Sequence, residues 1–159
     1  MKSAKYFIQF LIISILFLVF RILGVKYASY ISGKIISIVG PLFRSRDLIR
    51  SNILRALPSL EPNQVKDISK KMWTNYGKIL AEYIFIKDFR NNKLKDNIEI
   101  KGQEILDIIK KNNEPVIFIS GHFSNFELMA MQIEKSGIDL AAVYRPLNNK
   151  FLNYIMEKI

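Results

Sequence analysis

Residues 6–20 read YFIQFLIISILFLVF, an apolar run that contains only two polar side chains. A helix over this run is about 22 Å long, and extending it to Val25 brings it to about 30 Å, the thickness of a bilayer's hydrocarbon core. Arg21 can then extend its charged end to the membrane interface. A cleaved signal peptide would need a small-residue cleavage site after the run, and the residues around Ala28 and Ser29 fit one poorly. A buried core helix is rarely apolar on every side. The run therefore predicts a membrane anchor over residues 1–25.

Charge is distributed unevenly along the 159-residue chain, which carries a net charge of +10 and no cysteine. Nine basic side chains and a single acid, Asp47, fall in residues 1–60, a net charge of +8, which leaves +2 for residues 61–159. The basic segment is also the most apolar one, so an anionic membrane surface is a better partner than nucleic acid. The lack of cysteine excludes disulfide scaffolds, thiolate zinc sites and thiol nucleophiles.

Residues 26–90 are predicted to form a helical, membrane-proximal region. Ile31, Ile35, Ile38 and Leu42 fall on one helical face, which is typical of a helix lying against a membrane, and the Gly40-Pro41 pair should end that helix. A long helix is expected to begin at Pro62, because proline suits the first turn. One face of this helix should be core, and its apolar side chains recur at spacings of three and four: Val65, Ile68, Met72, Tyr76, Ile79 or Leu80, and Tyr83, with Trp73 beside them.

Residues 91–159 are predicted to form part of an α/β domain. The apolar patterns predict strands at 98–101, 116–120 (VIFIS, buried on both faces) and 140–144, with helices at 104–112 and 123–135. The pairs Asn112-Asn113 and Ser136-Gly137 should end those two helices. A strand, a helix and a strand within about thirty residues form a βαβ unit, so we expect a mostly parallel sheet flanked by helices.

His122, the single histidine, directly follows the predicted strand 116–120, and Glu127 comes five residues later. Ligands of open α/β sheets bind at this end of the strands. An imidazole can accept a proton from a hydroxyl near neutral pH, and a carboxylate can orient the ring and stabilise its charged form. A hydrogen-bonded structural histidine in a loop is the alternative. A metal site is not expected, because no second histidine and no cysteine could complete it.

Several stretches resemble the late lipid A acyltransferase family (lauroyl and myristoyl acyltransferase type) of the H-x4-D/E membrane acyltransferases. They are VIFISGHFSNFELMAMQ (116–132), AAVYRPLNN (141–149), SNILRALP (51–58), the N-terminal anchor and the long helix leading to Glu82. Relatives that act on phospholipids usually have asparagine before the histidine and aspartate at the end of the motif. Gly121 and Glu127 occupy those places here, which favours the lipid A branch.

The resemblance implies a bacterial inner-membrane enzyme with its catalytic part on the cytoplasmic face. It would move a fatty acyl group from acyl carrier protein to a hydroxyl of a lipid A precursor, a phosphorylated glucosamine lipid, with no metal, no cofactor and no covalent acyl-enzyme. His122 would be the general base and Glu127 its orienting partner. Arg145 and Asn148 would contact the substrate, although a solvated arginine and a simple turn are the alternatives for these positions.

Members of the family are longer, and the resemblance implies a further essential arginine directly after Ile159. The 159 residues are therefore expected to be a fragment or a truncated form that lacks part of the site and is inactive by itself. Two other functions stay open at this point. One is a glycerophospholipid or ornithine-lipid acyltransferase, and the other is a membrane-anchored protein without catalytic activity.

Overall fold

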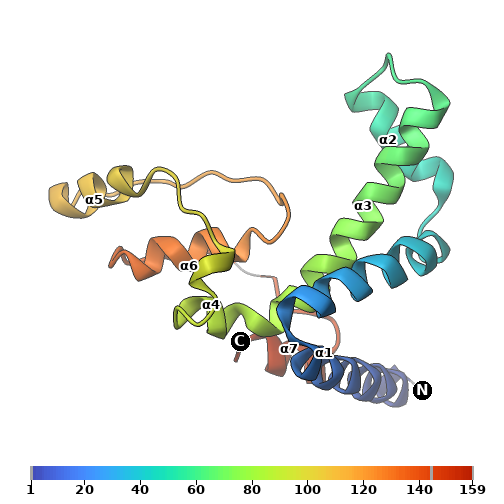
Figure 1. The fold of residues 1–159 in the computed structure, drawn as a ribbon, viewed down its shortest axis with the longest axis horizontal. Coiled ribbons are helices and arrows are strands. Elements are labelled where there is room, and N and C mark those ends of the chain that lie inside the picture. Colours follow the sequence, from blue (N-terminus) through green and yellow to red (C-terminus); the bar gives the residue numbers. More distant parts are fainter. Residues whose placement is uncertain (1, 144, 159) are drawn as a thin grey trace. The chain divides into compact units, whose positions relative to one another are not determined.

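The computed structural model describes residues 2–143 and 145–158, and its regular elements are helices (Figure 1). Their order is α1 (Lys2–Val39), the 3-10 turn η1 (Gly40–Leu42), α2 (Arg46–Ala56), α3 (Pro62–Glu82), η2 (Tyr83–Phe85), α4 (Ile86–Arg90), η3 (Lys95–Asn97), α5 (Gln103–Asn112), α6 (Glu127–Lys135) and α7 (Lys150–Met156). The backbone contacts divide the chain into two units. One runs from Phe17 to Glu82, and the other combines the residues up to Leu16 with those from Tyr83 onward.

The apolar N-terminal run forms α1, which is kinked at Gly24. Gly24 has φ 74° and ψ 161°, a conformation that side chains with a Cβ rarely adopt. Among the described residues, the segment Ser3–Leu42 is the one helix long and apolar enough to cross a membrane, with a mean hydropathy of 2.5 and only 11% of its most apolar window buried. By length and composition, α1 is therefore suited to membrane association. The predicted domain boundaries at residues 25 and 90 stay predictions.

In the unit Phe17–Glu82, the second half of α1 packs closely against α3. A Cβ on Gly77 would lie 2.4 Å from the carbonyl oxygen of Ser32, so the two backbones touch there. Ala28 and Ala81 are fully buried, whereas Tyr76 is 56% exposed. The predicted core stripe of α3 is therefore partly wrong: small residues, rather than the large one at 76, occupy the contact. Small side chains let two helix backbones approach, which a large ring would prevent.

The ends of α2 and α3 carry the capping bonds that their sequences suggest. The hydroxyl of Ser45 accepts a hydrogen bond from the Leu48 N–H at 3.4 Å, which caps α2. Before α3, the Glu61 N–H donates to the side-chain oxygen of Gln64 at 2.8 Å, one half of a capping box. Pro62 occupies the first position of α3, as predicted. Local signals therefore account for both helix starts.

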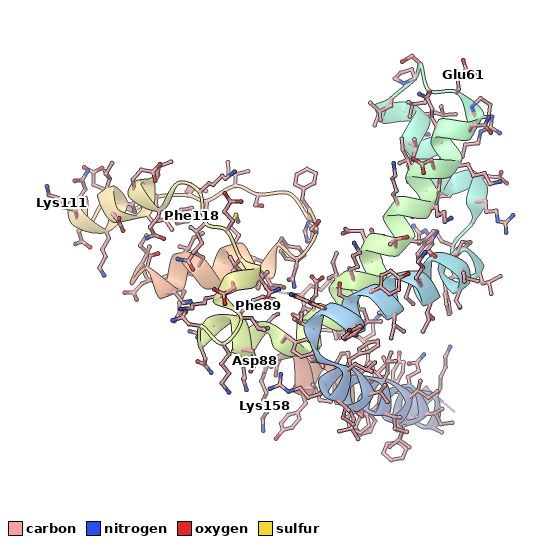
Figure 2. All side chains as sticks on the ribbon, viewed as in Figure 1. Glu61, Asp88, Phe89, Lys111, Phe118 and Lys158 are labelled. Atoms are coloured by element: carbon pink, nitrogen blue, oxygen red, sulfur yellow. The ribbon has the colours of Figure 1, made fainter. Side chains whose placement is uncertain are left out.

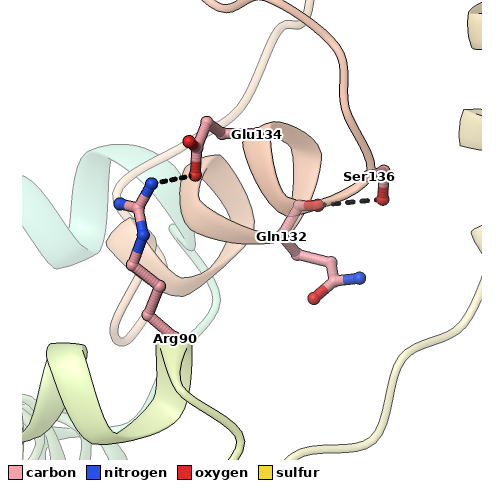
Figure 3. Close-up of polar contacts among 4 residues, drawn as sticks. All are labelled: Arg90, Gln132, Glu134 and Ser136. Carbon is pink, nitrogen blue, oxygen red and sulfur yellow. Dashed lines mark hydrogen bonds and ion pairs between the residues drawn. The ribbon is translucent and has the colours of Figure 1, made fainter.

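The other unit has its core between α4 and α6. Buried apolar side chains from η2, α4 and α6 meet there, and they are Phe85, Ile86, Phe89, Met131 and Ile133. Figure 2 shows Phe89 and Asp88 on α4. An ion pair between Arg90 and Glu134 joins the two helices at the surface (Figure 3). This packing fixes the direction of α6, whose first residue is Glu127.

The predicted mostly parallel sheet is wrong. No strand occurs in the described residues, and the segments 98–101, 116–120 and 140–143 have no regular structure. Tyr144, the end of the third predicted strand, lies outside the described residues. Ile117 and Ile119 are 90% and 93% exposed, so this run is not buried on two faces. The physical reason is that a strand exists only within a hydrogen-bonded ladder, and no backbone hydrogen bond joins these described segments.

The helices of this region fit their predictions better. α5 ends at Asn112, and Asn113 follows in the left-handed conformation with φ 52°, as the Asn112-Asn113 pair suggested. α6 ends at Lys135 before Gly137, which has φ 78°. Its start is later than predicted, at Glu127 rather than residue 123. Ser124 has φ 48° and interrupts the helical conformation between these two positions.

Candidate active site

His122 lies in the irregular segment between α5 and α6, and its side chain is exposed. Its ring contacts the ring of Phe126 edge to face, with centroids 4.4 Å apart. The residue before it is Gly121, and a Cβ at this position would lie 2.4 Å from the exposed ring of Phe123, which would have to move to make room. A backbone bond of 2.8 Å from the Phe123 N–H to the Gly121 carbonyl closes a tight turn around the histidine. The turn thus presents the imidazole to solvent.

Glu127 is the first residue of α6 and is half-buried. The hydroxyl of Tyr83 donates a long hydrogen bond of 3.5 Å to Glu127 Oε1. A carboxylate in the first turn of a helix interacts favourably with the helix dipole. Phe126, at the N-cap, offers no side-chain hydrogen bond, so the first N–H groups of α6 have no side-chain cap. The start of α6 therefore carries a carboxylate in contact with Tyr83, while the N–H groups of Leu128 and Met129 donate to the carbonyls of Asn125 and Phe126 at 3.2 and 3.1 Å.

Within the described residues, no hydrogen bond or ion pair joins His122 to Glu127. The predicted pairing of base and orienting carboxylate stays a prediction. Catalytic hydrogen bonds are often absent or long before the substrate binds and tighten only in the reacting complex. Both side chains belong to one short segment of the chain, which brings the two groups into the same region.

Asn125 is a polar residue of this segment that the sequence reasoning did not single out. Both polar atoms of its side-chain amide are buried without a hydrogen-bond partner among the described residues. Buried polar groups are nearly always satisfied, so an unsatisfied amide next to a candidate base is a candidate for contacting substrate. Its place within GHFSNFE, between His122 and Glu127, is the signal that could have identified it.

The two predicted substrate-binding residues, Arg145 and Asn148, are both exposed, and nothing in the structure tests their role. The neighbouring Asn149 has a different position. Its side-chain oxygen accepts from the N–H groups of Phe151 and Leu152 at 3.1 and 3.3 Å, which caps α7. Its amide donates to the carbonyl of Tyr6 at 2.9 Å. Asn149 therefore ties α7 to the start of α1.

A cavity of about 570 Å³ in the same unit is mainly apolar. Ile100, Ile105, Phe118 and Met129 are among the residues that line it. None of the four predicted site residues is among its described lining residues. In the described part of the chain, no group of three or more His, Cys, Asp or Glu side chains is placed to hold a metal ion.

Comparison with known proteins identifies the family. The model of the bacterial lipid A biosynthesis acyltransferase family matches residues 1–159. The chain belongs to this family. It is similar to the lipid A biosynthesis myristoyltransferase of Escherichia coli (strain K12), with 23% identity over 127 residues. The matched region covers 80% of this chain and 39% of that relative, so the chain matches well under half of the relative's length. No solved structure matches the chain.

Membership of the lipid A acyltransferase family agrees with the resemblance carried by GHFSNFE and the segment after it. Sequence reasoning predicted that His122 and Glu127 carry the chemistry, and this assignment stays a prediction. It did not identify Tyr83, which holds Glu127 from an element 44 residues earlier. The packing of α4 against both η2 and α6 places that hydroxyl, and the spacing of residues along the chain does not reveal it.

Proposed function

We propose that this protein takes part in acyl transfer in lipid A biosynthesis, moving a fatty acyl group from acyl carrier protein to a hydroxyl of a phosphorylated glucosamine lipid. The observation that carries the proposal is the family match over residues 1–159. The name of the similar Escherichia coli protein, a lipid A biosynthesis myristoyltransferase, supports the same reaction class. Because the chain matches 39% of that relative, the proposal concerns the gene product that carries these residues.

In the proposed reaction His122 acts as the general base. Its imidazole takes the proton of the acceptor hydroxyl while the oxygen attacks the carbonyl carbon of the acyl thioester. The carbon–sulfur bond then breaks, and the imidazolium gives its proton to the departing thiolate, which leaves as the thiol of the carrier protein. Glu127 orients the imidazole and stabilises its charged form. The exposure of His122 supports this role, because the hydroxyl of a large lipid can reach an exposed ring.

Binding of the acceptor is assigned to Arg145 and Asn148. An arginine is suited to phosphate because its guanidinium presents several N–H donors in a plane. Both side chains are exposed and therefore accessible to a ligand. The amide of Asn125, buried without a partner, is a further candidate for contact with the substrate.

We place the reaction at the cytoplasmic face of the bacterial inner membrane. The apolar helix α1 supports membrane association by its length and composition. The net charge of +8 in residues 1–60 supports contact with a surface of anionic lipid. A lipid acceptor that resides in a membrane requires an enzyme held at that surface.

The test compares variants of the gene product in membranes. The donor is acyl carrier protein that bears a labelled acyl group, and the acceptor is a lipid A precursor. His122→Ala should lower the transfer rate by a factor of about 10²–10⁴, the usual contribution of a general base. Glu127→Gln should also lower it. Glu104→Gln is the matched control, since Glu104 is an acid in the first turn of α5, and this variant should keep full activity.

Full activity of His122→Ala, with the protein present in membranes at the normal level, would contradict the assignment of the base. A parallel assay with lysophospholipid as acceptor tests the acceptor class. Transfer to lysophospholipid but not to the lipid A precursor would show that the acceptor is a glycerophospholipid.

A further inference from the structure

A cleft of about 510 Å³ lies between α2 and α3, in the unit that runs from Phe17 to Glu82. Its volume falls in the range of about 300–1,000 Å³ that is usual for small-molecule sites. The third side is formed by the end of α1 and the turn η1, from which Ser37 and Pro41 line it. Every residue that lines the cleft belongs to this unit.

Two basic side chains line the cleft from each helix, Arg46 and Arg50 from α2 and Lys66 and Lys70 from α3. The members of each pair are four residues apart, so they are neighbours on one helix face and repel each other. Asp47 is the one acid among the described lining residues. In residues 2–143 and 145–158, no ion pair joins any of the four cations to a carboxylate. The cleft therefore holds an excess of positive charge that an anion would neutralise.

The floor of the cleft is apolar. Val65, Ile49 and Trp73 contribute to it. The indole ring of Trp73 packs directly on Gly40, where an added Cβ would lie 2.3 Å from the ring. The ring of Tyr76 contacts the indole in a tilted arrangement, with centroids 5.9 Å apart. The indole is therefore held between neighbours, and the cleft combines a fixed apolar floor with cationic walls.

The cleft adjoins the end of the candidate membrane span, Ser3–Leu42, because Pro41 lines it. Next to it, Ile38, Leu42 and Phe43 are 76%, 79% and 78% exposed. Exposed apolar side chains beside a basic, tryptophan-containing site are typical of a segment at the membrane–water interface. At that depth lie the phosphates of the lipid headgroups.

We propose that this cleft binds the phosphate of an anionic phospholipid of the bilayer, and that its apolar floor receives the upper part of an acyl chain. This site is additional to the acyl-transfer residues at His122 and does not depend on that function. Cationic walls and an apolar floor in one concave site match a headgroup joined to a chain. An acidic protein partner would instead need a broad exposed face of roughly 800 Å².

Trp73 is the single tryptophan of the chain and lines the cleft, so its fluorescence reports occupancy. The full chain is reconstituted into phosphatidylcholine nanodiscs with increasing fractions of phosphatidylglycerol that is brominated near the top of one acyl chain. Bromine quenches tryptophan on contact. Brominated phosphatidylglycerol should quench Trp73 at a several-fold lower mole fraction than brominated phosphatidylcholine.

The variants Arg50→Gln and Lys66→Gln remove one charge from each wall. Each should raise the mole fraction of phosphatidylglycerol needed for half-quenching about fivefold, because that is roughly what one basic side chain contributes to the affinity for an anionic surface. Arg50→Lys keeps the charge and should change it little. The matched control is Lys111→Gln on α5 (Figure 2), which removes one charge outside the cleft and should leave quenching unchanged.

Equal quenching by the two brominated lipids would overturn the proposal, as would a Lys111→Gln effect equal to that of both cleft variants. Added acyl carrier protein, an acidic soluble protein, is the last arm. A Trp73 emission shift on its addition to discs of pure phosphatidylcholine, without selective quenching by phosphatidylglycerol, would overturn the lipid site in favour of a protein partner. Unchanged Trp73 emission of the variants in phosphatidylcholine shows that their cleft is folded.

Discussion

Replacing Gly77 by alanine tests how closely the second half of α1 packs against α3. The new Cβ would lie 2.4 Å from the Ser32 carbonyl oxygen and 2.8 Å from the Gly33 Cα, both backbone atoms. Non-bonded heavy atoms normally lie about 3.5 Å or more apart, so the two helices must separate by about 1 Å to admit the Cβ. Backbone atoms cannot rotate away as the end of a side chain can. Gly77→Ala should therefore destabilise this unit.

Two opposing effects set the size of that change. Overpacking costs about 1–3 kcal/mol, whereas alanine gains about 1 kcal/mol over glycine in a helix interior. The expected net loss in the free energy of unfolding is up to about 2 kcal/mol. Gly33→Ala is the matched control, because it is the same change in a helix but its Cβ would meet Lys78 Cγ and the Thr74 carbonyl oxygen only at 3.2 Å. It should stay within a few tenths of a kcal/mol of the unchanged protein or gain slightly.

The assay is thermal unfolding of the detergent-solubilised chain, followed by the emission of Trp73. This residue lies on α3 with its ring against Gly40, so it reports on this unit. At about 2–4 °C per kcal/mol for a chain of this size, Gly77→Ala should melt several degrees below Gly33→Ala. A Gly77→Ala protein that melts at or above Gly33→Ala would refute the close backbone contact between α1 and α3.

Three further predictions concern single contacts in the other unit. Tyr83→Phe removes the hydrogen bond to Glu127 and should lower the acyl-transfer rate by less than about tenfold with little change in KM, since the bond is long; an unchanged rate would show that Tyr83 does not position the carboxylate. Asn149→Ala removes the cap of α7 and should speed amide hydrogen exchange in its first turn, a loss of about 1–2 kcal/mol, and unaltered exchange would contradict it. The side chains of Arg90 and Glu134 are 48% and 47% exposed, so a double-mutant cycle followed by thermal unfolding should give a coupling energy below about 1 kcal/mol. A much larger value would show that the pair is shielded from water.

Helix positions were predictable wherever a local signal set them. The start at Pro62, the end of α1 before Gly40-Pro41 and the end of α5 before Asn113 follow from residues that act on their own backbone. The kink at Gly24 was not predicted, because glycine permits a positive φ without requiring it.

The strands failed for a physical reason. The composition of residues 116–120 indicates a strand, but a strand forms only when partners supply hydrogen bonds on its edges. Composition and alternation describe one segment at a time, and they do not say whether a ladder partner is present. In the described structure the segment has none, and Ile117 and Ile119 stay exposed.

The candidate site shows the same division. His122 and Glu127 were predicted as site residues from their chemistry and spacing within one segment, and no contact in the structure tests that prediction. The contact of Tyr83 with Glu127 and the burial of the Asn125 amide came to light only in three dimensions, because both depend on how segments pack.

By itself, the sequence determined the apolar character of α1, the basic charge of the first 60 residues, several helix ends and the match to the lipid A acyltransferase family. These depend on residue type and on neighbours within a few positions. Tertiary structure alone decided that Gly77 and Ala81 form the contact face of α3, that Asn149 ties α7 to Tyr6, and that a cationic cleft opens between α2 and α3. Those features arise where segments far apart in the chain meet, and the packing of whole helices sets which atoms touch.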